Sequence, residues 1–478
     1  MSRLGPRGWS GRHGGRASWV TIPPEMRAST AQVCGLYPFG VGGESPMIGV
    51  PLGHNLLTGS TVCCDPINWF ARAHLIGNPS AFVLGLPALG KSTLIRRMLI
   101  GLSAQGVRPL VLADTKPDFS DLVRALGGQV IRMGGAEALN ILDPGQMGRA
   151  AALLAGKPAA AAELRERIQQ RRLDMLIGLI VLMREGPVAD AERALLAAGL
   201  RELEAAHEGR RPPVLDDLLR LLQQPTGHMR AVTMDRGDDE KYHAVADPLS
   251  VSLMTLTHGE LGSTFGRQTT TPLDLAAPAI SVDISNIGTG SAKVRAAMML
   301  ASWNEGYAAV DAAKALADAG AEPQRRFILA LDELWAVLRT GNGLVARVDA
   351  LTRLNRNEGV GQIMCSHTMA DLRAIANPAD REMAKGFVER AGMQILGGLP
   401  SAELRQVAEV VGLTAAEKRM VASWSTPSSM AAQARPPGLG KFLIKVGSRP
   451  GIPVQVKLTR AEVAGGFHDT NKRWREPA

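Results

Sequence analysis

A phosphate-binding loop is the clearest chemical feature of the sequence. The Walker A pattern G-x-x-x-x-G-K-[ST] lies within residues 85–93. The apolar run Ala81–Leu84 directly precedes it, and the helix-forming run Leu94–Ile100 directly follows it. A strand, a glycine-permitted turn and a helix start, in this order, direct backbone N–H groups and the positive end of a helix at phosphates. The sequence therefore predicts a nucleoside triphosphate site.

The residues of this loop are expected to have different tasks. We expect Lys91 to reach the β- and γ-phosphates and the Ser92 hydroxyl to ligate Mg²⁺, so the predicted cofactors are ATP and Mg²⁺. The other positions supply the backbone that surrounds the phosphates. The predicted nucleotide-binding residues are Gly85, Leu86, Pro87, Ala88, Leu89, Gly90, Lys91, Ser92 and Thr93.

A second apolar run ends in two carboxylates, which is the Walker B pattern. Asp332 and Glu333 follow Phe327–Leu331 directly. Open α/β sheets bind ligands at the carboxyl ends of their strands. We therefore expect Asp332 to hold Mg²⁺ through water and Glu333 to act as general base on the attacking water. A strand that stops at a solvated acidic turn is the alternative, but the upstream loop favours an ATPase.

Further polar residues follow this acidic strand. His367 comes after the apolar strand Gln362–Cys365 and is the candidate sensor of the γ-phosphate, with a hydrogen-bonded structural histidine as the alternative. Arg353 and Arg356 are three residues apart, so both fit one helix face. They are the candidates for an arginine finger, which often comes from a neighbouring subunit, and a solvated surface charge is the alternative.

Composition limits the classes of protein that fit. The chain has 478 residues, more than a domain with one hydrophobic core usually contains, and its hydrophobic content is 45%. Its formal charge of +9 fits an acidic partner such as nucleic acid or an anionic membrane face, but the charge alone does not decide between contact and none. Four cysteines without a C-x-x-C pair argue against a zinc site and suit a reducing cytosol. The longest apolar stretch, 175–183, is well short of the about 18 residues that a membrane span needs.

The pattern of apolar runs predicts four parts. Residues 1–30 form a flexible basic tail, and residues 31–146 begin an α/β domain that contains the phosphate loop. Residues 147–245 carry Ala, Leu, Arg and Glu at helical spacing and form a helical insertion. Residues 246–478 complete the α/β domain with the acidic strand and a C-terminal hairpin. The charged stretch 235–243 is expected to be an exposed loop.

The order of the motifs resembles a known family. The phosphate loop is followed by D-T-K-P-D-F at 114–119, N-I-L-D-P at 140–144, the helical segment, G-E-L-G-S-T-F at 259–265 and D-E-L-W at 332–335. This order is similar to that of the motor ATPases of type IV secretion and conjugative transfer, the TraC-like branch of the FtsK/HerA superfamily. The resemblance covers about residues 45–478.

This resemblance implies a RecA-like P-loop ATPase with a mostly parallel central sheet flanked by helices, plus an all-helical insertion. It implies a homo-oligomer, a hexamer, on the cytoplasmic side of a membrane transfer channel, with channel proteins of the inner membrane as partners. The family usually has an additional N-terminal domain, so docking by another chain is expected. It commonly has Gln where His367 stands.

Two alternatives to a secretion motor stay open at this point. One is a DNA-pumping translocase or coupling protein of the same superfamily, for which DNA is a direct partner. The other is a nucleotide-binding scaffold with little turnover. Stimulation of ATP hydrolysis by DNA separates the first from the secretion motor, and loss of turnover in Glu333→Gln separates the second from both.

Overall fold

One large sheet organises the molecule. The computed structural model describes residues 47–207, 211–287, 292–332, 359–375, 377–425 and 436–468, with the single positions 334, 338, 345 and 349. These residues form an 11-stranded sheet in the order β2-β1-β11-β10-β9-β3-β8-β7-β4-β6-β5. The strands are β1 (Pro51–Asn55), β2 (Thr61–Cys63), β3 (Ser80–Leu84), β4 (Val107–Asp114), β5 (Gln129–Arg132), β6 (Ile280–Asp283), β7 (Arg326–Leu331), β8 (Val360–Ser366), β9 (Met393–Leu396), β10 (Lys441–Lys445) and β11 (Ile452–Val456).

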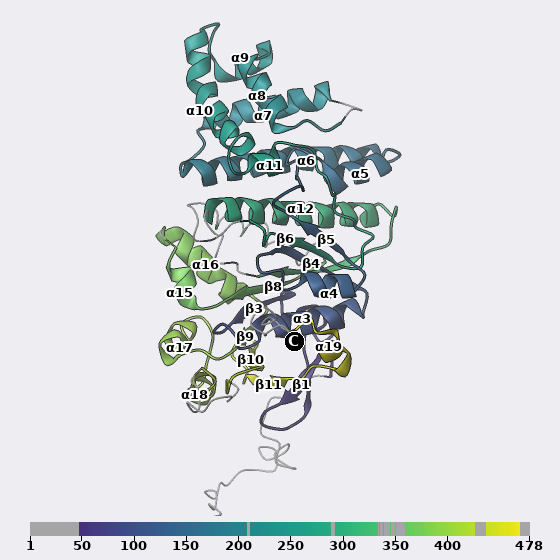
Figure 1. Ribbon diagram of the computed structural model, residues 1–478, viewed down its shortest axis with the longest axis vertical. Coiled ribbons are helices and arrows are strands. Elements are labelled where there is room, and N and C mark those ends of the chain that lie inside the picture. The colour runs from purple at the N-terminus through teal and green to yellow at the C-terminus, as the bar shows by residue number, and fades with distance from the viewer. Residues whose placement is uncertain are drawn as a thin grey trace, which may run out of the picture. The chain divides into compact units, whose positions relative to one another are not determined.

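Helices lie in most of the connections between these strands (Figure 1). The described helices are α2 (Pro66–Ala71), α3 (Lys91–Ser103), α4 (Ser120–Ala125), α5 (Gly145–Leu153), α6 (Pro158–Arg184), α7 (Asp190–Ala206), α8 (Leu215–Gln223), α9 (Gly227–Thr233), α10 (Asp239–Thr257), α11 (Gly262–Phe265), α12 (Ala292–Asp318), α15 (Met369–Arg373), α16 (Pro378–Arg390), α17 (Ser401–Val407), α18 (Ala415–Ser423) and α19 (Arg460–Gly465). None of these helices combines the length and the apolar character that crossing a bilayer requires.

The part of the sheet from β9 to β5 is parallel, and its strands are largely buried on both faces except for the edge strand β5. Successive residues of a strand point to opposite faces, so the all-apolar β3 contributes Phe82 to one core cluster and Val83 to the other. The cluster with Val83 includes α3, and the cluster with Phe82 includes α12 and α16. On α12, Trp303 donates its indole N–H to the carbonyl of Leu112 at 2.9 Å, which fixes this helix on β4. The predicted fold class, a mostly parallel sheet flanked by helices, is confirmed.

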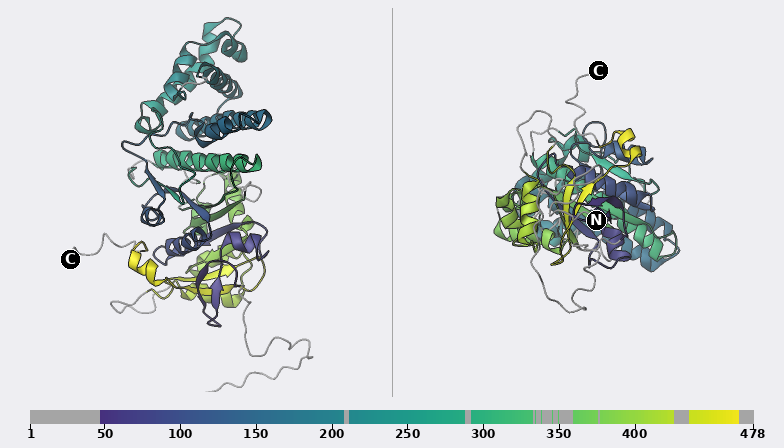
Figure 2. Two further views of the ribbon diagram at one scale, coloured as in Figure 1. Left: turned by 90° about the vertical axis from the view of Figure 1, so that its right-hand side faces the viewer. Right: turned by 90° about the horizontal axis from the view of Figure 1, so that it is seen from below.

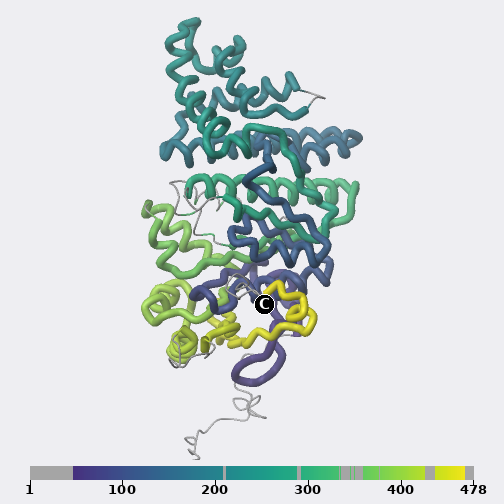
Figure 3. The backbone as a smooth tube through the Cα atoms, in the orientation of Figure 1, coloured from purple at the N-terminus to yellow at the C-terminus, as the bar shows by residue number. Residues whose placement is uncertain are grey.

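The two ends of the described chain meet in the antiparallel part of the sheet. The predicted C-terminal hairpin is present as β10 and β11, and β11 also pairs with β1. Figure 3 shows the yellow C-terminal segment beside the purple N-terminal one. An ion pair of 3.1 Å between Arg97 of α3 and Glu462 of α19 adds to this contact. The C-terminal segment is therefore built into the same sheet as the phosphate loop.

The segment from α5 to α10 is helical, and α6 packs along α12, as Figure 2 shows. Arg171 of α6 donates to the carbonyl of Asn304 at 3.0 Å and forms a 2.5 Å ion pair with Asp311 of α12. The exposed loop expected at 235–243 is wrong in its second half, because α10 begins at Asp239. Asp238 caps this helix by accepting from the backbone N–H groups of residues 240 and 241.

The domain boundary expected between residues 245 and 246 falls inside α10. This helix packs against α6, α7, α8 and α9, so the helical segment continues to Thr257. The described residues belong to one compact unit, Gly43–Ala478.

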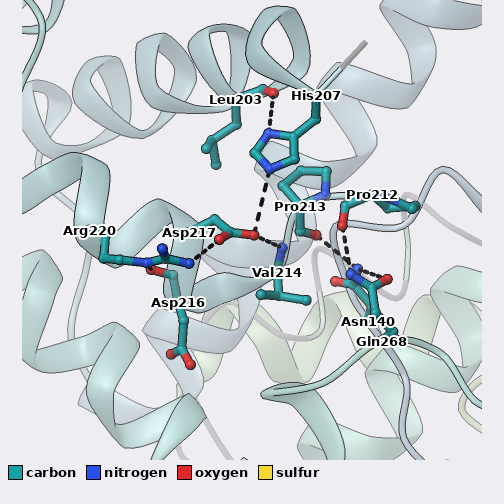
Figure 4. A network of polar contacts seen from close by, with 10 residues as sticks. All are labelled: Asn140, Leu203, His207, Pro212, Pro213, Val214, Asp216, Asp217, Arg220 and Gln268. Carbon is teal, nitrogen blue, oxygen red and sulfur yellow. Dashed lines mark hydrogen bonds and ion pairs between the residues drawn. The ribbon is translucent and has the colours of Figure 1, made fainter. Parts of the chain in front are cut away.

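Asn140, from the N-I-L-D-P piece, connects the helical segment to the chain that follows β5 (Figure 4). Its buried side chain donates to the carbonyl of Pro213 at 2.8 Å and to the amide oxygen of Gln268 at 3.3 Å. Gln268 in turn donates to the carbonyl of Pro212 at 2.7 Å. This amide pair fixes the start of α8 against the segments around residues 140 and 268, which is a structural role.

Candidate nucleotide site

The backbone of the phosphate loop has the curvature that the motif requires. The loop connects the end of β3 with the start of α3 at Lys91. Gly90, at φ +94°, and Ala88, at φ +62°, are both in the left-handed region, and glycine adopts this region without strain. A Cβ atom on Gly85 would lie 3.1 Å from the Cα atom of Gly397, so the close approach of these two chains favours glycine there.

Three neighbouring segments hold the loop in place. Gly85 donates its N–H to the carbonyl of His367 at 3.1 Å, after β8. Leu86 donates to the carbonyl of Gly398 at 3.0 Å, after β9. On the far side, Gly440 donates to the carbonyl of Leu89 at 3.0 Å, just before β10. The loop is therefore fixed by chain segments on both of its flanks.

Lys91 is directed into its own loop. Its side chain is buried, and its ammonium group donates to the carbonyls of Gly85 at 2.6 Å and Leu86 at 3.1 Å. The same nitrogen lies 3.0 Å from Nδ1 of His367. An ammonium group can only donate, so Nδ1 is the acceptor when these two groups share a hydrogen bond. The structure thus brings together two residues that the sequence predicted separately for the triphosphate site.

Asp332 lies at the same edge of the sheet. It follows β7, which pairs with β8, which in turn pairs with β3. Leu84 pairs with Ser366, so β3 and β8 end at the same level, while Leu331 pairs with Met364, so β7 ends slightly before them at the same edge of the sheet. The predicted Glu333, Arg353 and Arg356 lie outside the described residues.

The described residues fit a magnesium site in which phosphate oxygens complete the coordination shell. No group of three or more His, Cys, Asp or Glu side chains that could hold a metal occurs among them. Ser92 at the start of α3 and Asp332 after β7 offer hard oxygen ligands, which Mg²⁺ prefers, and Mg²⁺ typically takes few protein ligands and keeps phosphate oxygens and waters. Bound there, Mg²⁺ would neutralise charge on the phosphates.

Two charged residues beside this edge have roles that the sequence did not indicate. Asp114 ends β4, next to β7, and accepts the N–H groups of Asp118 at 3.1 Å and Phe119 at 2.8 Å. Burial is the main cause that raises the pKa of Asp114 to about 7, and the charges of Asp118 and Asp332 add to it. Asp114 thereby orders the D-T-K-P-D-F segment.

Arg96 holds the phosphate-loop helix against that segment. Its side chain is fully buried on α3, 3.6 Å from the carboxylate of Asp118 and over the ring of Phe119. It also donates to the carbonyl of Phe467 at 2.8 Å. Burial lowers the pKa of Arg96, and the charges of Asp118 and Asp114 oppose this shift. The sequence shows Arg96 only as one of two adjacent arginines in this helix, and such an arginine is more often a surface charge.

We compared the sequence and the structure with known proteins. No protein-family model matches the sequence, and no curated protein matches it. Among solved structures, VirB4 of Thermoanaerobacter pseudethanolicus superposes with a TM-score of 0.64 at 18% identity, over 88% of this chain and 100% of that one. The chain has the fold of VirB4. The plasmid coupling protein TrwB, solved with a non-hydrolysable ATP analogue, matches with a TM-score of 0.51 at 12% identity, over 93% of this chain and 96% of that one.

The likeness to VirB4 covers most of this chain. It confirms the RecA-like P-loop fold that the order of motifs predicted. TrwB was solved with a nucleotide on this fold, and the loop of the present chain has the strand, turn and helix that such a ligand needs.

Proposed function

We propose that this chain is an ATP-hydrolysing motor of a type IV secretion or conjugative transfer apparatus. One observation supports the proposal: on the fold of VirB4, the neighbouring parallel strands β3, β8 and β7 end at one edge of the sheet, and Lys91, His367 and Asp332 follow these strand ends in the sequence. A phosphate loop, a polar strand end and an acidic strand end are the parts that hydrolysis of a nucleoside triphosphate needs.

The proposed chemistry is attack of water on the γ-phosphorus of ATP. Glu333 takes a proton from the water, and the bond from the γ-phosphorus to the bridging oxygen breaks, which releases ADP and phosphate. Lys91 binds the phosphates, Ser92 and Asp332 hold Mg²⁺, and His367 contacts the γ-phosphate. Arg353 and Arg356 are the candidates for a finger supplied by a neighbouring copy in a hexamer.

The proposed setting is the cytoplasmic face of the inner membrane, with the proteins of the transfer channel as partners. The helical insertion contributes no strand to the parallel sheet. We therefore propose that it contacts the channel proteins. The formal charge of +9 is compatible with DNA as a further contact.

Steady-state phosphate release from ATP tests this function. The wild-type protein is expected to hydrolyse ATP, and Glu333→Gln is expected to bind ATP with unchanged affinity but to lose turnover. Equal turnover in wild type and variant contradicts the role of Glu333. Wild-type protein that binds ATP without measurable turnover supports the scaffold alternative instead.

A DNA-pumping translocase is the second candidate, because the TrwB coupling protein shares the fold. The same assay with added single- and double-stranded DNA distinguishes it. A secretion motor is expected to hydrolyse ATP at one rate with and without DNA, whereas a pump is expected to be stimulated several-fold. The salt dependence of that stimulation separates phosphate contact from base contact.

A further inference from the structure

A leucine lies beside the phosphate loop, on the flank opposite His367 and Asp332. Leu439 precedes β10, and its Cδ1 atom would lie 4.0 Å from a Cβ atom on Gly90. Its side chain is 41% exposed, although most leucines of this domain are buried. Isolated exposed leucines are common, so exposure alone does not indicate a function for Leu439. Its position beside the phosphate loop and the fixed conformation of its backbone are the informative features.

Hydrogen bonds to the phosphate loop and to β11 hold the backbone around Leu439. Gly440 donates to the carbonyl of Leu89 at 3.0 Å and accepts from the N–H of Val456 at 2.8 Å. Gln455 donates to the carbonyl of Leu439 itself at 3.2 Å. A Cβ atom on Gly440 would lie 2.9 Å from the side-chain nitrogen of Gln455, so this segment has no free space behind it. The leucine is thus presented at a fixed position against the loop.

The strand order gives the direction in which a bound nucleotide runs. From β3, the sheet continues through β8 and β7 on one side and through β9 and β10 on the other. His367 and Asp332 lie on the first side, so a nucleotide bound through the proposed sensor and magnesium residues would have its γ-phosphate there. Its α-phosphate, ribose and base would then extend toward the second side, where Gly90 lies beside Gly440 and Leu439.

We propose that Leu439 is the platform for the nucleobase, which packs its flat apolar face on the leucine side chain. The proposal rests on the proposed nucleotide binding at the phosphate loop. It adds that the side of the loop toward β9 and β10 accepts the nucleobase. A leucine side chain offers dispersion and apolar burial but no hydrogen bond, so it holds a purine ring without identifying its edge. ATP and GTP are therefore expected to bind with dissociation constants within about threefold of each other.

Isothermal titration of the full chain with ATP, GTP and inorganic tripolyphosphate, each with Mg²⁺, tests the platform. Tripolyphosphate has the phosphates of the ligand but no base. In Leu439→Ala, ATP and GTP are expected to bind about three- to tenfold more weakly, while tripolyphosphate binds as to wild type. Leu439→Met keeps an apolar face and is expected to retain wild-type affinity for all three. Leu57→Ala, at another exposed leucine, is the control and is expected to change nothing.

Several outcomes would overturn the platform. Unchanged ATP affinity in Leu439→Ala does so, and so does an equal loss for tripolyphosphate, which would mean that the leucine only supports the loop. A preference of more than about tenfold for one purine also contradicts it, because that requires hydrogen bonds to the base edge. Wild-type protein that binds neither ATP nor tripolyphosphate would overturn the nucleotide site itself, which is a different failure from loss of the base contact alone. Thermal unfolding of each variant shows that it is folded.

Discussion

The ammonium nitrogen of Lys91 lies 3.0 Å from Nδ1 of His367. The contact joins the start of α3 to the end of β8, two segments that are 276 residues apart in the sequence. Because both residues sit where the phosphates of a loop-bound ligand are expected, His367 contacts the same lysine that the ligand needs. We therefore propose that the histidine orients Lys91 and meets the γ-phosphate.

Replacement of His367 by alanine should lower turnover more than affinity. Loss of a polar group at the reacting phosphate is expected to decrease the turnover number by about tenfold or more, while the dissociation constant of ATP changes by less than about threefold. His367→Gln, which keeps a polar side chain, should retain more activity than His367→Ala. Equal turnover in the alanine variant and wild type would mean that the histidine has only a structural role.

Gly90→Ala should impair nucleotide binding more than stability. Gly90 has φ +94°, and Gly59, in the turn before β2, has φ +72° with open space around it. Alanine at either position costs about 1–2 kcal/mol of unfolding free energy, because both require the left-handed region. Only Gly90→Ala is expected to weaken ATP binding, as measured by titration. Loss of ATP binding in Gly59→Ala as well would show that general destabilisation is the cause.

Glu305 of α12 should make stability depend on pH. It lies in a pocket beside Asp143 and Arg171, and burial is the main cause that raises its pKa to about 7 from 4.5. Asp143 adds to this shift and Arg171 opposes it. Between these two pKa values the folded state binds a proton that the unfolded state has lost, so the free energy of unfolding falls as pH rises toward 7 and stays low above it.

Glu305→Gln removes this titration. At pH 8 the variant is expected to exceed wild type by about 2 kcal/mol in the free energy of unfolding, and near pH 5 the two should be similar. Urea unfolding at the two pH values measures the difference. A constant difference at both pH values would contradict the assigned cause.

Lys445→Met should destabilise the attachment of α18 to the C-terminal hairpin. The fully buried ammonium group of Lys445 lies 3.1 Å from a carboxylate oxygen of Glu417 and donates to the carbonyl of Arg449 at 2.6 Å. Removal of one partner leaves a buried charge without compensation and is expected to cost about 3 kcal/mol in urea unfolding. The control is Lys385→Met, which breaks a more exposed pair with Glu389 and should cost below about 0.5 kcal/mol. Similar losses in both variants would contradict the importance of burial.

The sequence predicted the parts of the site that depend on local pattern. Apolar runs that end in Gly85 or Asp332 identified β3 and β7, because a buried parallel strand and the turn behind it are encoded by neighbouring residues. The start of α10 was missed although Asp238 is a typical N-cap, because its cluster of charges was interpreted as an exposed loop.

Other features depend on contacts between distant residues. The pairing of β1 with β11, and the placement of Leu439 on the phosphate loop, join segments that are far apart in the chain. The burial of Arg96 follows from the same long-range packing, since Asp118 and Phe467 come to it from other elements. Local pattern contains no signal for such contacts, so only the assembled sheet shows them.

Phosphate release from ATP by wild type and by Lys91→Ala tests the central claim most directly, with Lys385→Ala as the matched lysine control. The account predicts hydrolysis by the wild type, hydrolysis at the same rate by Lys385→Ala, and no hydrolysis above background by Lys91→Ala, because the lysine at the phosphate loop binds the phosphates. Hydrolysis by Lys91→Ala at the wild-type rate would contradict the account, because ATP would then be turned over at a site other than this loop.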